Sequence, residues 1–116
     1  SCQTDSLGEQ DGQKDEVAKY LGQWSVSDQA ARINYQVTIE RDPVYANQIY
    51  LKNFADAGDK ATGLIVGDKV FLDKQQVGSD FTSEGEGQYV DSKNLKFEFY
   101  IDDGIDKDSR KASFTR

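Results

Sequence analysis

The side chains of this sequence that could do chemistry are carboxylates, and one pair, Glu84 and Glu86, has a spacing seen in enzymes. The two lie in a segment that alternates like a β-strand, so both point to the same strand face. Paired carboxylates flank the scissile bond in glycoside hydrolases. Two like charges on a solvated strand face give the same pattern, and the sequence has no histidine to carry a proton. We therefore expect a noncatalytic protein.

A second group of carboxylates surrounds Gly104. It consists of Asp102, Asp103, Asp106 and Asp108. Loops of this composition can bind calcium weakly, but the spacing differs from an EF-hand and no bidentate glutamate follows. Aspartates are also common in solvated turns. With one cysteine and no histidine the chain cannot form a disulfide or the usual zinc and haem sites. We predict no cofactor and no metal site, with calcium at this loop as the open alternative.

The single cysteine, Cys2, begins a polar and acidic stretch over residues 2–14. This stretch has too few apolar residues to offset its ordering entropy, so we predict a flexible tether over residues 1–14 with an end-to-end distance of roughly 20 Å. A small residue before a cysteine that opens such a tail resembles the processing junction of bacterial lipoproteins, where the cysteine is lipidated. An incidental cysteine is the alternative.

The charge balance argues against nucleic-acid partners. The chain has 116 residues, 21 acidic and 14 basic side chains and a pI near 4.5, so its surface would repel phosphate backbones and anionic headgroups. Its length suits one domain with a modest core. No apolar run approaches the roughly 18 residues of a membrane span. We expect membrane contact only through a lipidated Cys2.

Alternation of apolar and polar residues dominates the rest of the chain and is typical of antiparallel strands with one wet face. A glycine-first turn at Gly67-Asp68 indicates a type II′ hairpin, and Gly85 and Gly87 are expected to mark curvature or to make room for a large neighbour. We predict a short helix at 15–21 and strands at 23–27, 32–40, 48–54, 60–66, 69–73, 81–90, 95–102 and 110–116. The fold class is all-β: a single domain over residues 15–116, an up-and-down antiparallel meander of about eight strands closed into a barrel.

Closure would bring the two ends of the folded chain together. The last strand would run antiparallel beside the first, so that Arg116 reaches the level of Trp24. We predict that the Arg116 guanidinium stacks on the indole, a contact of about 0.5 to 2 kcal/mol depending on burial. The helix at 15–21 would cover the same end.

Gly22 and Trp24 form a glycine, any residue, tryptophan motif at the start of the first strand, behind a helical turn and near Arg116. This arrangement resembles the lipocalin and calycin pattern. With a lipoprotein-type start, the Asn53-Phe54 pair and the glycines at 85 and 87, the chain is similar to short lipocalin-like lipoproteins of Bacteroidetes. The resemblance implies a lipocalin-like barrel with Gly22, Trp24 and Arg116 at its closed end. It also implies lipid anchoring in the cell envelope at the outer membrane, on either its periplasmic or its surface side.

The resemblance further implies a small apolar or amphipathic ligand at the open end of the barrel. Barrels of this size either fill with side chains or hold one small molecule. The residues predicted to line a pocket, or alternatively a core, are Tyr35, Phe97, Phe99 and Phe114. The rival hypothesis is a surface module or inhibitor that binds an envelope protein or a glycan. Its outer strand faces would present Tyr50, Phe54 and Tyr100, which could stack on sugars.

Overall fold

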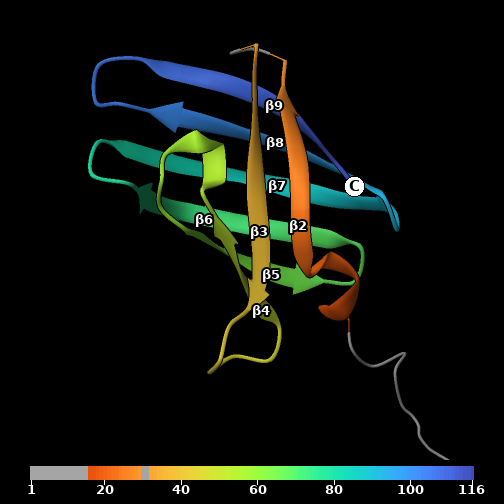
Figure 1. Ribbon diagram of the computed structural model, residues 1–116. Coiled ribbons are helices and arrows are strands. Elements are labelled where there is room, and N and C mark those ends of the chain that lie inside the picture. Colours follow the sequence, from red (N-terminus) through yellow and green to blue (C-terminus); the bar gives the residue numbers. More distant parts are fainter. Residues whose placement is uncertain (1–15, 30–31) are drawn as a thin grey trace, which may run out of the picture.

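The computed structural model describes residues 16–29 and 32–116, which form eight antiparallel strands (Figure 1). The strands are β2 (Gly22–Asp28), β3 (Ile33–Arg41), β4 (Gln48–Lys52), β5 (Ala61–Val66), β6 (Lys69–Val77), β7 (Phe81–Asp91), β8 (Asn94–Asp102) and β9 (Lys107–Thr115). Each strand pairs with the next along the chain, and β9 also pairs with β2, so the sheet closes into a barrel. The predicted up-and-down meander and its closure are confirmed.

The alternation of residue types decides which face of each strand is buried. In β3, Tyr35, Val37 and Ile39 are buried while the residues between them are largely exposed. Across the β2–β3 pair, Trp24 lies opposite Val37 and Val26 lies opposite Tyr35. Inward residues of neighbouring strands therefore meet at the same level and form a continuous core. The two-residue turn predicted between β5 and β6 is also present, with Gly67 at φ +60°.

Gly87 of β7 makes room for the Phe97 ring on β8, and Gly85 allows the β8 backbone to approach closely at Phe99. Gly87 lies opposite Phe97, and Gly85 lies opposite Phe99. A Cβ atom added to Gly87 would lie 2.5 Å from the Phe97 ring, and one added to Gly85 would lie 2.5 Å from the Phe99 Cα. Such distances are too short for real contacts, so any larger residue here would displace an aromatic residue or its strand.

One end of the barrel, which we call the closed end, is formed around Trp24. Its side chain is fully buried, and its indole N–H donates to the Tyr20 carbonyl oxygen at 2.9 Å. The Arg116 guanidinium carbon lies 3.8 Å from the centroid of the Trp24 ring, so the predicted stacking is present. Arg116 also donates hydrogen bonds to the carbonyl oxygens of Leu21, Lys19 and Ser92. One exposed arginine thus joins the C-terminal end of the chain to two other segments, residues 19–21 and the β7–β8 turn, over the indole.

The helix expected at 15–21 is shorter than predicted. The described residues form a single 3-10 turn, η2 (Ala18–Tyr20), and Leu21 is already extended. Only Val17 and Tyr20 of this segment are buried. One turn is enough to bring these two side chains onto the core, so no longer apolar helical face is needed.

The other end, which we call the opposite end, is capped by the turn η3 (Phe54–Asp56). Asn53 takes a left-handed conformation with φ +66°, and its side-chain amide donates to the Gln36 carbonyl oxygen at 3.0 Å. The left-handed residue interrupts the inward–outward alternation of side chains that β4 would otherwise continue. Phe54 therefore points into the barrel and is 1% exposed. The prediction that Phe54 points outward was wrong, because it assumed that β4 continues through Asn53.

Replacement of Arg116 by alanine removes the stacking contact and three hydrogen bonds. We expect the free energy of unfolding to fall by about 1 kcal/mol with the fold preserved, as followed by urea and thermal denaturation. Lys111→Ala, an exposed position in β9, is the charge-matched control and should change stability by less than about 0.5 kcal/mol. Identical unfolding of Arg116→Ala and wild type would rule out the stabilising role of this contact.

Candidate functional site

The four aromatic residues predicted to line a pocket or a core are all buried: Tyr35, Phe97, Phe99 and Phe114. Phe97 stacks on Phe114 with ring centroids 4.5 Å apart. Phe99 packs against Phe54 of the η3 cap with centroids 4.7 Å apart. These three phenylalanine rings and the Phe54 side chain therefore pack on one another inside the barrel.

A polar cluster that the sequence reasoning missed lies inside the barrel beside Tyr35. Asp28, which is 1% exposed, accepts a hydrogen bond from the Arg110 guanidinium at 2.9 Å. Burial and then the charge of Asp28 raise the pKa of Tyr35. The sequence did contain a signal for the burial of Asp28. This residue follows Trp24 and Val26 at every second position of β2, and these positions face inward. Breaking this pair would leave a buried charge, so it holds β2 to β9.

The residues assigned to the closed end are brought together as predicted. Gly22 has φ +117°, and a Cβ atom at this position would lie 3.1 Å from Nη1 of Arg116. A glycine is therefore needed both for the backbone conformation and for the close approach of the guanidinium. Gly22, Trp24 and Arg116 form a packed structural unit. Cys2 and the predicted tether lie outside the described residues.

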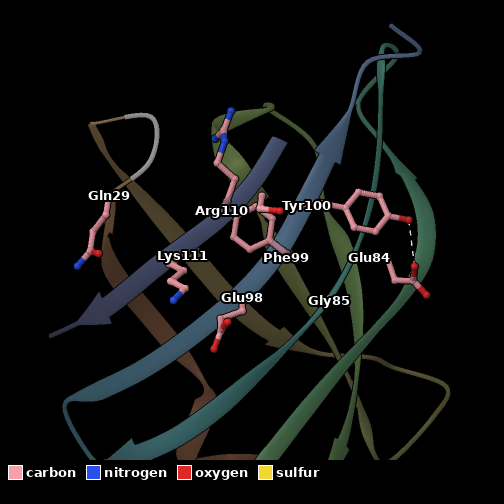
Figure 2. Close-up of a pocket in the computed structure, with 9 residues that line it drawn as sticks. Gln29, Glu84, Gly85, Glu98, Phe99, Tyr100, Arg110 and Lys111 are labelled. Atoms are coloured by element: carbon pink, nitrogen blue, oxygen red, sulfur yellow. Dashed lines mark hydrogen bonds between the residues drawn. The ribbon is translucent and has the colours of Figure 1, made fainter. Parts of the chain in front are cut away.

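A groove crosses the outer wall of the barrel over β7, β8 and β9 (Figure 2). Its floor follows a row of three paired residues, Gly85, Phe99 and Arg110. Because the side chains of Phe99 and Arg110 turn to the inner face and Gly85 has none, this row leaves a hollow between outward-pointing neighbours. Its volume is about 630 Å³, within the range of small-ligand sites. The lining residues are Gln29, Glu84, Gly85, Glu98, Phe99, Tyr100, Ser109, Arg110 and Lys111.

One wall of the groove is built by Tyr100 and Glu84. They lie opposite each other on β8 and β7, and the Tyr100 hydroxyl donates to Oε1 of Glu84 at 3.0 Å (Figure 2). Partial burial and then this hydrogen bond raise the pKa of Tyr100. Lys107, which does not line the groove, places its ammonium 4.0 Å from the centroid of the Tyr100 ring. Two contacts therefore fix the orientation of the ring.

The other wall carries opposite charges. Glu98 lies opposite Lys111 on β9 and opposite Glu86 on β7. Glu86 is in turn 3.6 Å from the Lys69 ammonium. A lysine thus accompanies each carboxylate in this row, which limits the repulsion between Glu86 and Glu98. Together with the first wall, the groove offers one aromatic ring, carboxylates, an ammonium, an amide and a hydroxyl.

The carboxylates considered for chemistry have separate surroundings. Glu84 and Glu86 share the outer face of β7, as expected, but Glu84 contacts Tyr100 whereas Glu86 contacts Lys69. In the loop after β8, Asp103 accepts hydrogen bonds from the backbone amides of Asp106 and Ile105, which lower the pKa of Asp103. Among residues 16–29 and 32–116, no group of three or more acidic or cysteine side chains is arranged to hold a metal ion.

Comparison with known proteins finds no relative: no family model, no curated protein and no solved structure matches this chain. No helix in the described part is long and apolar enough to cross a bilayer. The function therefore has to be inferred from the geometry of the chain.

Proposed function

We propose that this protein is a noncatalytic, lipid-anchored, lipocalin-like barrel of the cell envelope that binds a glycan in the groove on its outer wall. The observation that carries the proposal is the contrast between the two faces of the sheet. Inside, Phe54, Phe97, Phe99 and Phe114 pack on one another. Outside, a groove of about 630 Å³ carries hydrogen-bonding side chains around a tyrosine.

The chemistry of the groove suits a sugar chain better than an apolar molecule. Sugars present C–H faces that pack on aromatic rings and hydroxyl groups that both donate and accept hydrogen bonds. Tyr100 supplies the ring, while Glu84 and Glu98 accept hydrogen bonds and Lys111 donates them. Gln29 does both. The Tyr100 ring is held by Glu84 and Lys107 before any ligand arrives, which reduces the entropy cost of binding.

A ligand inside the barrel is less well supported. A small apolar molecule at the opposite end would have to displace Phe54, which is 1% exposed and lies 4.7 Å from Phe99 between ring centroids. It would also meet the ion pair of Asp28 and Arg110, whose separation would cost several kcal/mol. The outer groove needs no such rearrangement.

The lipid anchor of the proposal rests on Cys2. A lipoprotein cysteine typically carries more than one acyl chain, which gives stable attachment without a basic surface patch. The formal net charge of -7 fits this mode of attachment better than electrostatic binding to anionic lipid. Catalysis is not part of the proposal, because Glu84 accepts a hydrogen bond from Tyr100 and Glu98 lies opposite Lys111, so both carboxylates are assigned to binding.

The glycan proposal predicts that Tyr100→Ala weakens binding by about tenfold, because the stacking surface is lost. Affinity electrophoresis through gels that contain mannan, xylan or β-glucan measures the effect. Tyr50→Ala is the matched control: Tyr50 lies on another part of the wall with the Lys60 ammonium 3.9 Å from its ring centroid, outside the groove lining. Absence of retardation by all three polysaccharides, or equal retardation of both variants, would refute the proposal.

The anchor proposal predicts that the protein, expressed with a lipoprotein signal peptide in a bacterial host, enters the membrane fraction. Cys2→Ala should shift it to the soluble extracytoplasmic fraction, because the acyl chains supply nearly all of its membrane affinity. Fractionation followed by immunoblotting measures this. Equal recovery of both proteins in the soluble fraction would overturn the lipoprotein assignment and leave the groove untouched.

A further inference from the structure

Large apolar side chains that remain exposed are concentrated at the closed end of the barrel. Six are exposed in the described part of the chain, and four of them belong to turns or strand ends here. These four are Val44 (76% exposed), Tyr45 (57%), Val66 (55%) and Val90 (50%). We call them the apolar tips. Phe71 lies on the barrel wall, and Ile105 lies in the loop between β8 and β9 at the opposite end.

The segments that carry the apolar tips are joined to one another by backbone hydrogen bonds. The Ile65 amide donates to the Asn47 carbonyl oxygen, and the Tyr89 amide donates to the Asp68 carbonyl oxygen, both at 2.8 Å. The loop after β3, the β5–β6 turn and the end of β7 therefore form one surface at the end of the molecule that carries η2 (Figure 1).

The most exposed of these residues sit on a fixed loop. Oδ1 of Asp42 accepts hydrogen bonds from the backbone amides of Val44 at 2.7 Å and of Tyr45 at 3.2 Å. These contacts hold both residues at the loop tip without burying either side chain. A valine beside a tyrosine on such a tip suits the boundary between lipid headgroups and acyl chains, where tyrosine is enriched.

Charge differs between the two ends. The opposite-end loops 53–60, 78–80 and 103–106 contain five aspartates and one lysine, and Arg32 between β2 and β3 adds a second cation at this end. Among the described residues of the closed end, four carboxylates face three cations: Glu16, Asp42, Asp68 and Asp91 against Lys19, Lys93 and Arg116. The closed end therefore carries a smaller excess of negative charge together with the apolar tips, and an anionic lipid surface would repel the opposite end more strongly.

The chain also enters the barrel at the closed end. The described chain begins at Glu16, whose carboxylate accepts a hydrogen bond from the Gly67 amide at 3.1 Å, within the closed end. Fifteen residues, including Cys2, precede Glu16 in the sequence. A tether to Cys2 therefore starts from the same end of the barrel as the apolar tips.

We infer that the closed end is a membrane-docking surface, with Val44 and Tyr45 entering the headgroup region of the bilayer to which Cys2 is anchored, in place of the contact through Cys2 alone that the sequence led us to expect. This inference rests on the proposed lipid anchoring. It adds an orientation: the barrel stands on its closed end, and the outer-wall groove faces sideways with its lining residues free of lipid.

The test uses Cys2 as an attachment point, since it is the only cysteine of the chain. The full chain is coupled through this thiol to phosphatidylcholine vesicles that contain a maleimide-headgroup lipid and brominated acyl chains. Val44→Trp and Ile105→Trp are compared, because both positions are strongly exposed and they lie at opposite ends. Trp24 is fully buried, and its signal is subtracted with the wild-type protein.

We expect the bromines to quench the new indole at position 44 at least about threefold more than the indole at position 105, with a blue shift of emission only at position 44. Equal quenching at the two positions would overturn the inference. Because the attachment is chemical, this result does not depend on natural acylation. The docking inference can therefore fail or hold independently of the Cys2→Ala fractionation, which tests the lipid anchor.

Sedimentation velocity of the uncoupled chain gives a second check: a dimer that Val44→Asp dissociates would assign the apolar tips to self-association and overturn membrane docking.

Discussion

The width of a barrel is fixed by its strand number, and in this protein aromatic rings occupy that width. Phe97 and Phe114 stack in the interior, Phe54 and Phe99 pack beneath the η3 cap, and Trp24 fills the closed end. Loss of one such ring from a close-packed interior typically costs about 3 to 5 kcal/mol. The glycines of β7, the arginine over the indole and the use of the outer wall all depend on this filling.

Because the inward side chains of each strand form the core, the outward side chains are the ones available for the proposed binding. The same register serves both purposes: the row of Gly85, Phe99 and Arg110 places a ring and a guanidinium inside and leaves a hollow outside. Docking through the closed end would keep that hollow on the side of the barrel, open to the surrounding envelope. Core and groove are thus both consequences of one alternating pattern on a closed sheet.

Much of this fold could be predicted because it depends on short sequence patterns that can be recognised one segment at a time. Alternation identified the strands, Gly67 identified a hairpin, and Trp24 with Arg116 indicated where the chain ends meet. The inward position of Phe54 could not be predicted, since it depends on one left-handed residue, Asn53, that interrupts the strand period.

The candidate site was less accessible from the sequence. Tyr100 was identified as an outward aromatic residue, but its partner Glu84 was considered only together with Glu86. The groove depends on the register of three strands, and the ion pair of Asp28 and Arg110 joins residues 82 positions apart. Neither leaves a local signal.

The measurement that tests the filled interior most directly is titration of the wild-type protein with cis-parinaric acid, a fluorescent fatty acid. We expect no saturable fluorescence increase in the wild type, whereas saturable one-to-one binding that persists in Tyr100→Ala would place a ligand inside the barrel and contradict this account.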